Sequence, residues 1–327
     1  MTTTTTPGTT APPAISAVGL RKSYGDKIVL NGLDLTIPQG SVFALLGPNG
    51  AGKTTTVQIL STLISFDAGQ AGVDGHDLAR NPDAVRAAIG VTGQFAALDN
   101  LLTAEENLHL MADLRHLPRR EGKRRATELL RRFDLTEAAR KPVSTFSGGM
   151  RRKLDLAMTL VGDPRIIFLD EPTTGLDPRS RRTMWEIIRD LVVEDGVTIF
   201  LTTQYLEEAD QLADRIAVLD HGRLVAEGTP DELKRIVPGG HIRLRFSGLA
   251  ELDSAARHFG TAARDPEELE LRIPSDGSIP ALRAVLDVLD DAAVQAESLT
   301  VHTPDLDDVF LTLTGHGTPN TTTEMAR

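Results

Sequence analysis

The residues from Gly47 to Thr54, with the sequence GPNGAGKT, constrain the fold more than any other stretch. They follow the apolar run VFALL and precede a helix-like segment over residues 55–63. Glycines adopt backbone conformations that other residues avoid, so successive N–H groups can converge on one anion at the positive end of the helix. Lys53 adds a mobile positive charge for the β- and γ-phosphates, and the hydroxyl of Thr54 suits the Mg²⁺ that accompanies them. The sequence therefore predicts a site for a nucleoside triphosphate. The residues assigned to it in this stretch are Gly47, Pro48, Asn49, Gly50, Ala51, Gly52, Lys53, Thr54 and Thr55.

The composition is that of a folded protein with more than one domain. The 327 residues exceed the ~100–200 of a single domain, and 25% of them are charged while 40% are hydrophobic. A net charge of −11 argues against a general affinity for nucleic acid or anionic lipid, because both need a basic surface. No apolar run approaches the ~18–20 residues of a membrane-spanning helix, and the threonine-rich start lacks the pattern of a signal peptide. We therefore expect a cytosolic protein unless a partner carries it to a membrane. The absence of cysteine excludes disulfides and thiolate metal sites.

A second candidate anion site is the stretch Ser147-Gly148-Gly149, which stands directly before a helix predicted over residues 151–161. Serine is a good N-cap residue, and the glycines leave the N–H groups at the positive helix end accessible. Taken alone, the same pattern is equally typical of an ordinary loop.

Two adjacent carboxylates, Asp170 and Glu171, end an apolar run over residues 165–169. Such a run is typical of a buried parallel strand, whose carboxyl end opens on the ligand crevice of an α/β fold. There Asp170 would hold Mg²⁺, directly or through a water molecule, and Glu171 would orient and deprotonate an attacking water. Further on, Asp177-Pro178 opens a predicted helix, as an N-cap and first residue do in many helices.

Short alternating segments before the phosphate loop predict antiparallel strands joined by tight turns at Gly25-Asp26 and Asn31-Gly32. Tyr24 ends one of these segments. Its ring could stack on a purine, or it could be a turn tyrosine with a hydrated hydroxyl. The segments are residues 15–18, 27–30 and 33–37.

Taken together and in this order, these motifs closely resemble the ATP-binding subunit of ABC transporters, over residues 15–238. The Ser-Gly-Gly element separates this family from most other phosphate-loop ATPases. Two further positions, Gln94 and Gln204, complete the resemblance. It implies a homodimer, or pseudo-dimer, in which two copies face head to tail. Each ATP then lies between the phosphate loop of one copy and residues 147–149 of the other.

The resemblance also implies roles for single residues. Gln94 would reach Mg²⁺ and signal to the helical segment that follows, where family members receive a separate integral membrane permease. Tyr24 would stack on adenine, and Asp177 would communicate across the dimer. The catalytic residues that it implies are Glu171, Gln204 and Lys53.

Three positions depart from the family pattern. Phe146 and Met150 replace the usual Leu and Gln beside Ser-Gly-Gly, which leaves the central donors in place. Gln204 stands where the family usually has a histidine. A glutamine amide can still donate a hydrogen bond to the γ-phosphate but carries no charge, so we expect a slower enzyme and not an inactive one.

The part of the chain after Gly240 alternates strand-like and helix-like segments, which indicates a small α+β unit, with a ferredoxin-like arrangement as one candidate. The end of the chain, residues 304–315, resembles that of the daunorubicin-resistance type of export ATPase. The stretch TTQYL over residues 202–206 resembles the same type.

The expected fold class is α/β: a phosphate-loop NTPase core with an antiparallel β subdomain and a helical subdomain, plus the C-terminal α+β domain. The expected parts are a tail at 1–13, the ATP-binding domain at 14–238 with its helical subdomain at about 97–162, the α+β domain at 239–315 and a tail at 316–327.

The resemblance implies an ATPase that energises an exporter of amphipathic drugs or antibiotics from the cytoplasmic face of the membrane. Its cofactors would be ATP and Mg²⁺, and no nucleic acid partner is expected. One alternative is a soluble ABC-type ATPase that acts on ribosomes or DNA, although this chain lacks a second ATP domain, long heptad runs and cysteine. The other is a regulator that binds ATP without hydrolysing it, and Glu171 argues against this.

Overall fold

The computed structural model describes residues 12–94, 96–236, 240–302 and 304–315. The chain divides into two compact units, at residues 1–230 and 231–327. Of the predicted N-terminal tail only Pro12 and Pro13 belong to the described residues, and the predicted C-terminal tail lies outside them. Pro238 and Gly239, where the expected domain boundary falls, also lie outside them. Along the part of the chain that the structure describes, no helix is both long and apolar enough to span a bilayer.

The first sheet of unit 1 is antiparallel, with the order β2-β1-β4-β5. The turn predicted at Asn31-Gly32 is wrong, because both residues lie inside one long strand, β2. There Gly32 has a φ of 82° and the register with β1 shifts, so the strand bulges where a reversal was expected. The sequence also predicts a small hairpin over residues 69–78 with its turn at Asp74-Gly75, and the antiparallel pairing of β4 with β5 confirms it. The strands are β1 (Ile15–Tyr24), β2 (Lys27–Ile37), β4 (Ala68–Val73) and β5 (His76–Asp77).

The second sheet has the order β10-β9-β3-β8-β7-β6 and is parallel except for its edge strand β10. Its central strands β3, β7 and β8 are buried along their whole length, as expected for parallel strands covered on both faces. Because they run in the same direction, their carboxyl ends meet at one edge, where ligands bind in such folds. The strands are β3 (Val42–Leu46), β6 (Ile89–Thr92), β7 (Ile166–Asp170), β8 (Thr198–Thr203), β9 (Arg215–Asp220) and β10 (Arg223–Gly228).

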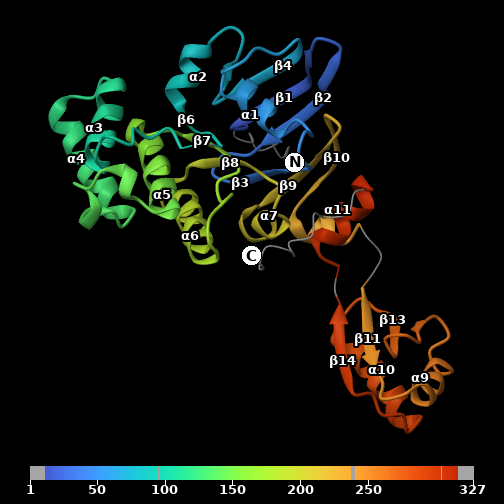
Figure 1. Cartoon of the computed structure of the whole chain (residues 1–327). Helices are drawn as coiled ribbons and strands as arrows, with labels where there is room; N and C mark the ends of the chain where they lie inside the picture. Colours follow the sequence, from blue (N-terminus) through green and yellow to red (C-terminus); the bar gives the residue numbers. More distant parts are fainter. Residues whose placement is uncertain (1–11, 95, 237–239, 303, 316–327) are drawn as a thin grey trace, which may run out of the picture. The chain divides into compact units, whose positions relative to one another are not determined.

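Helices cover both faces of the second sheet. Helix α1 lies between the two sheets and packs on β4 and β7, whereas α6 and α7 pack against β8 from the other side (Figure 1). The core between the layers includes Phe43, Phe200 and Phe168 from three neighbouring strands, with ring centroids 5.7 and 5.6 Å apart. The helices of unit 1 outside the helical subdomain are α1 (Lys53–Leu60), α2 (Pro82–Ala88), α6 (Pro178–Asp195) and α7 (Leu206–Leu212), and α8 (Pro230–Lys234) begins at the last residue of unit 1.

A helical subdomain is inserted between β6 and β7 and forms a separate layer at the left of Figure 1. The sequence Thr103-Ala104-Glu105-Glu106 is typical of a helix start, and the first helix begins there, because Thr103 and Glu106 form a capping box. The elements are α3 (Ala104–Leu114), α4 (Arg119–Arg132) and α5 (Gly148–Thr159), with 3₁₀ turns at Thr136–Ala138, Val143–Thr145 and Leu160–Gly162.

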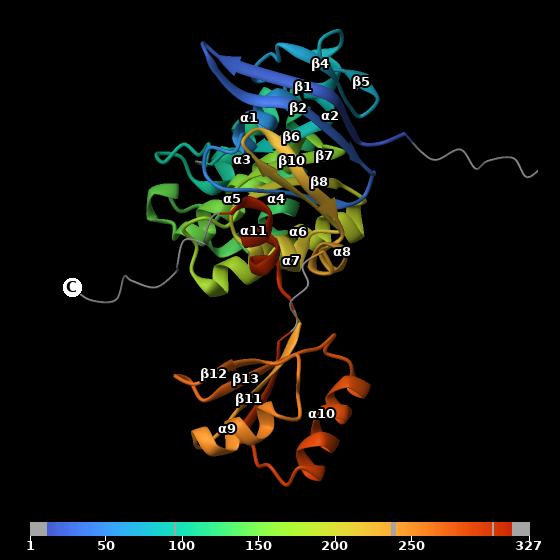
Figure 2. The ribbon, with the colours of Figure 1, turned by 90° about the vertical axis from the view of Figure 1, so that its right-hand side faces the viewer.

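Unit 2 contains a four-stranded antiparallel sheet with the order β12-β13-β11-β14, and α9 and α10 lie on one of its faces (Figure 2). This order, with the chain sequence βαββαβ, is the ferredoxin-like arrangement. The short strand β12 has no hydrophobic alternation and was not predicted. The elements are β11 (His241–Arg245), α9 (Leu249–Ala256), β12 (Ala263–Asp265), β13 (Glu270–Pro274), α10 (Ile279–Asp291), β14 (Ser298–His302) and α11 (Leu306–Thr314).

Candidate functional site

The phosphate loop predicted from the sequence joins β3 to α1 and packs closely on neighbouring backbone. A Cβ atom at Gly47 would lie 2.3 Å from the carbonyl oxygen of Leu219, so only glycine fits there. Gly52 has a φ of 113°, and a Cβ there would lie 2.8 Å from Leu30 Cδ2. Helix α1 begins at Lys53, and neither a capping side chain nor an acidic residue occupies its first turn. Its N-terminal N–H groups therefore remain available to an anion.

Lys53 lies over this loop with only 5% of its surface exposed. Its Nζ donates to the carbonyl oxygens of Gly47 at 2.8 Å and Pro48 at 3.2 Å. The same nitrogen lies 3.9 Å from Glu171 Oε1. Burial lowers the pKa of Lys53, and the charges of Glu171 and Asp170 oppose that shift. The ammonium group thus connects the loop to the acidic end of β7.

The end of β7 carries Asp170, which is buried beside two hydroxyl groups. Its Oδ1 accepts hydrogen bonds from Thr202 Oγ1 at 2.5 Å and Thr54 Oγ1 at 3.3 Å. Three oxygens from sequence-distant elements therefore meet at one point. Oxygen ligands of this kind suit Mg²⁺, which proteins often bind through one or two carboxylates together with substrate phosphates. The described residues contain no group of three or more histidine, cysteine or carboxylate side chains placed to hold a metal.

Glu171 is held in an unusual conformation directly after the strand. Its φ is 50°, in the left-handed region that glutamate seldom adopts, and only 9% of its surface is exposed. The backbone N–H donates to the carbonyl oxygen of Thr202 at 3.1 Å, and Oε2 accepts from Thr174 Oγ1 at 3.2 Å. Strained backbone of this kind is concentrated at functional sites, because only surrounding structure can maintain it.

The predicted second anion site lies at the start of α5. Ser147 is its N-cap, and Oγ accepts from the N–H of Met150 at 3.3 Å, which confirms the predicted cap. Ser147 and Gly148 are exposed, whereas Phe146 is buried. Among the residues that the structure describes, no hydrogen bond or ion pair joins residues 147–149 to residues 47–54. Within one chain the two candidate anion sites are therefore separate.

Asp177 is the N-cap of α6, with Pro178 as the first helical residue, as its sequence pattern indicates. Its Oδ1 accepts from the N–H groups of Arg179 and Ser180, both at 3.0 Å. Its Oδ2 accepts from Ser180 Oγ at 2.6 Å, and the hydrogen bonds from Ser180 lower the pKa of the carboxyl.

Arg152, on α5, was not predicted as part of the site, yet it contacts most of its segments. Its guanidinium donates to three backbone carbonyls: Gly93 at 2.9 Å, Pro172 at 2.8 Å and Asp170 at 3.2 Å. The buried carboxylate of Asp155 lies 3.2 Å away and accepts from the N–H of Ala97 at 3.0 Å. Burial lowers the pKa of Arg152 and raises that of Asp155. The spacing of Arg and Asp by three residues on a helix is the one sequence signal that could have revealed this pair.

Arg152 and Asp155 hydrogen-bond to Gly93 and Ala97, which lie on either side of the exposed Gln94 after β6. Gln204 directly follows β8 and is half-buried. Tyr24 ends β1 with 50% of its surface exposed, and Lys22 Nζ lies 5.4 Å from its ring centroid. The structure thus places Gln94 and Gln204 after parallel strands of the second sheet, and Tyr24 in a hairpin of the first sheet. The adenine contact of Tyr24 stays a prediction.

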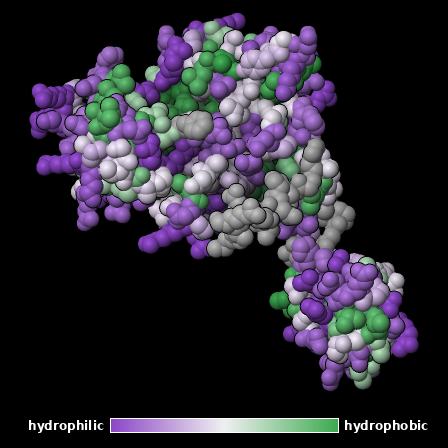
Figure 3. Space-filling view, viewed as in Figure 1, coloured by the Kyte–Doolittle hydropathy of each residue, from purple (hydrophilic) through white to green (hydrophobic). Residues whose placement is uncertain are grey.

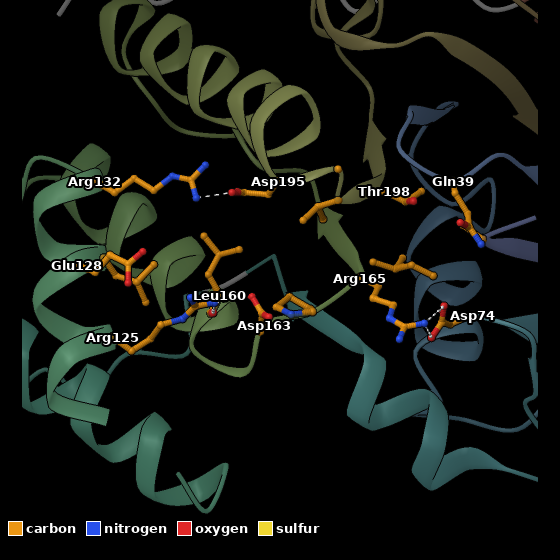
Figure 4. Close-up of a pocket in the computed structure, with 16 residues that line it drawn as sticks. Gln39, Asp74, Arg125, Glu128, Arg132, Leu160, Asp163, Arg165, Asp195 and Thr198 are labelled. Atoms are coloured by element: carbon orange, nitrogen blue, oxygen red, sulfur yellow. Dashed lines mark hydrogen bonds and ion pairs between the residues drawn. The ribbon is translucent and has the colours of Figure 1, made fainter. Parts of the chain in front are cut away.

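A cavity of about 370 Å³ lies elsewhere in unit 1, beside the starts of β7 and β8 (Figure 4). Ion pairs line it, among them Arg132 with Asp195 at 2.6 Å and Arg165 with Asp74 at 3.3 Å. No phosphate-loop residue contributes to it. Because parallel strands begin at the edge opposite the ligand edge, this cavity is not the nucleotide site.

An apolar groove of about 720 Å³ lies on the helical subdomain, between α3 and the segment after Gln94. Leu101 is 89% exposed, and Leu110 and Leu114 are also exposed. Figure 3 shows apolar surface over α3. Its lining residues include Leu98, Leu101, Leu110, Met111, Leu114 and Met158. Exposed apolar surface of this extent is typical of a site that another protein covers.

Comparisons with known proteins show the family of the chain. The family described as ABC transporter matches residues 30–174. The chain is 50% identical to the daunorubicin resistance ATP-binding protein DrrA2 of Streptomyces coeruleorubidus, over 94% of this chain and 97% of that protein. It is 46% identical to the daunorubicin/doxorubicin resistance ATP-binding protein DrrA of Streptomyces peucetius, over 96% of each chain. Among solved structures, a dimeric ATP-binding cassette bound to ADP and Pi in a post-hydrolysis state is 27% identical, with a TM-score of 0.60. That match covers 66% of this chain and 98% of that one.

Proposed function

The chain belongs to the family of ABC transporter ATP-binding proteins, and from this membership we propose the roles of its own residues in transport. The chain is an ATPase that binds ATP and energises a drug exporter. We propose amphipathic drugs or antibiotics as the exported class, because the relatives at 46–50% identity bear daunorubicin resistance names.

The phosphate loop and Lys53 would bind the β- and γ-phosphates. The close packing of Gly47 and Gly52 supports this role, because it fixes the loop beside the first turn of α1, where no capping side chain or acidic residue competes with a phosphate. Thr54, Asp170 and Gln94 would hold Mg²⁺. When bound, the metal would neutralise charge that develops on the phosphates during transfer.

Glu171 would orient the attacking water and accept its proton. The observation that carries this proposal is the buried carboxylate of Glu171, held at a positive φ and 3.9 Å from the phosphate-binding Lys53. A carboxylate fixed beside a phosphate site can act as general base without costly rearrangement. The amide of Gln204, at the end of the neighbouring strand, would donate to the γ-phosphate.

The second half of the site would come from another copy of the chain. Ser147 and Gly148 are exposed at the positive end of α5, and no hydrogen bond between described residues joins them to the phosphate loop of their own chain. Head-to-tail pairing would bring this helix start to the γ-phosphate held by the partner copy. ATP would then close the dimer, and loss of the γ-phosphate would let it reopen.

The apolar groove would receive an integral membrane permease, which would bring this subunit to the cytoplasmic face of the membrane. The groove adjoins Gln94, whose segment is tied to the γ-phosphate region through Arg152. Movement at the nucleotide could therefore reach the permease through one hydrogen-bonded connection.

The experiment that tests the site compares Glu171→Gln with the unaltered chain, with Mg²⁺ and ATP. We expect turnover to fall by about 10²–10³-fold, because a positioned general base contributes on this order. The variant should still bind ATP and should form an ATP-dependent dimer, measured by light scattering. The exposed Glu186→Gln, on α6, is the matched control and should retain activity. Unchanged hydrolysis in Glu171→Gln would remove Glu171 from catalysis, and a monomer at saturating ATP would refute the head-to-tail site.

A further inference from the structure

Glu208, on α7, is a buried carboxylate that the proposed reaction does not use. It has 0% of its surface exposed. Its Oε1 accepts hydrogen bonds from Thr173 Oγ1 at 2.7 Å and Trp185 Nε1 at 3.2 Å. Among the described residues, Oε2 has no hydrogen-bond partner. One carboxylate oxygen thus collects two donors from two other segments.

These segments carry groups that the proposed reaction uses. Thr173 lies two residues after Glu171, in the loop from β7 to α6 that also contains Asp177. Trp185 belongs to α6, and its side chain is buried. Glu208 itself lies four residues after Gln204, on the helix that follows β8. Glu208 therefore joins the loop that follows Glu171 to the helix that follows Gln204.

Burial of a carboxylate at this position carries a desolvation cost. Removal from water disfavours the charged form, and burial accordingly raises the pKa of Glu208. The hydroxyls of Thr203 and Thr173, the indole of Trp185 and the charge of Arg181 oppose that shift. An apolar side chain of similar size would pack without this penalty. The carboxylate instead accepts two hydrogen bonds of defined direction, which hold Thr173 and Trp185 at fixed positions.

We propose that Glu208 is a positioning residue of the ATPase, which fastens the loop after Glu171 to helix α7 and so fixes Glu171 relative to Gln204. This inference rests on the proposed function, because it assumes that both residues serve hydrolysis. Displacement of a reacting group by about 1 Å can cost on the order of 10²-fold in rate. Loss of the connection should therefore lower kcat while ATP binding at the phosphate loop persists.

The first test compares Glu208→Ala and Glu208→Gln, with Glu207→Ala as the matched control on the same helix. Glu207 is exposed. We expect kcat of Glu208→Ala to fall by about 10²-fold with KM for ATP changed less than about threefold. Glu208→Gln should recover kcat to within about fivefold, because its amide oxygen accepts the same two hydrogen bonds. A purely structural role would instead lower the melting temperature and leave kcat of the folded fraction unchanged.

The second test does not depend on the folding of Glu208→Ala. Thr173→Val removes one donor and keeps the side-chain shape, and Thr173→Ser keeps the donor. We expect Thr173→Val to lower kcat by about tenfold, the effect of one hydrogen bond to a charged group, and Thr173→Ser to restore it. In the double variant Thr173→Val/Glu208→Ala the two effects should not add, because both single changes remove the same contact.

The inference would be overturned by a Thr173→Val variant with unchanged kcat, or by a folded Glu208→Ala with the kcat of the unaltered chain. Glu171→Gln in the same assay separates this failure from failure of the proposed function. If Glu171→Gln is slow while the Thr173 and Glu208 variants are fast, only the positioning role is wrong. If Glu171→Gln is fast, the catalytic site itself is wrong.

Discussion

Two helices of unit 1 have glycines at their N-terminal ends, but the surroundings of these two ends differ. Helix α1 begins after a glycine-containing turn, helix α5 begins with two glycines, and neither has an acidic residue in its first turn. At α1 the loop is packed so tightly that Gly47 and Gly52 admit no Cβ, and Lys53 is buried among carbonyl and carboxylate oxygens. At α5 the residues Ser147 and Gly148 are on the surface. One half-site is therefore packed within the chain, whereas the other lies on the surface, where we propose that a second copy of the chain binds.

The strongest test of the α1 half-site is Lys53→Ala. We expect hydrolysis to fall by about 10³-fold, because the variant loses a preorganised cation beside the transferred phosphate. ATP binding should weaken as well, because the defect lies in the half-site that holds the nucleotide. Turnover is measured by phosphate release and binding by titration of a fluorescent ATP analogue.

The control for this variant is Lys123→Ala, which removes an exposed lysine of α4. It should match the unaltered chain in both assays. Full ATP affinity in Lys53→Ala would mean that the nucleotide does not depend on the α1 half-site.

Ser147→Ala tests the α5 half-site. We expect turnover to fall by about 10²-fold while ATP affinity of the single chain is retained, since the serine would act on a partner's nucleotide. The exposed Ser144→Ala, three residues earlier, is the control. Weakened ATP binding in Ser147→Ala monomers would contradict the separation of the two half-sites.

Mixing the Lys53→Ala and Ser147→Ala chains tests whether the two half-sites combine across a dimer. A head-to-tail pair of Lys53→Ala with Ser147→Ala contains one intact site, made of the phosphate loop of one chain and the α5 start of the other. An equimolar mixture should regain about a quarter of the normal rate, because half of the random pairs have one of two sites restored. No recovery on mixing would show that each chain works alone.

Gln204 follows β8 and belongs to the α1 half-site, and its replacement should have a smaller effect than Lys53→Ala or Ser147→Ala. Gln204→Ala should lower turnover by about tenfold through loss of one hydrogen bond, whereas Gln204→His should equal or exceed the unaltered chain. Steady-state turnover at saturating ATP measures both. Equal rates for Ala and His would remove Gln204 from the site.

The smallest effect on turnover is expected for a substitution beside Ser147 in the α5 half-site. Met150→Gln restores the residue that the resemblance predicts there, while Ser147 keeps its hydrogen bond from the backbone N–H of residue 150. Turnover should change by less than about twofold, since Met150 is only half-buried and its replacement leaves the backbone donor in place. A large gain would show that the side chain at position 150 contributes to the site.

Much of the fold could be predicted because its signals are local. The caps at Ser147 and Asp177, the capping box at Thr103 and the apolar run before Asp170 each depend on a few neighbouring residues. Asn31-Gly32 misled the prediction for the same reason. The dipeptide favours a turn, but pairing with β1 kept the strand continuous and turned the glycine into a bulge.

The sequence by itself determined the phosphate loop, the acidic strand end and the order of motifs, since each is encoded in adjacent residues. Only the tertiary structure decided that Arg152 reaches Gly93, Pro172 and Asp170, and that Glu208 reaches Thr173 and Trp185. It also decided the positive φ of Glu171. These features arise from contacts between residues far apart in the chain. Burial, which makes such polar contacts necessary, exists only once the strands and helices have packed.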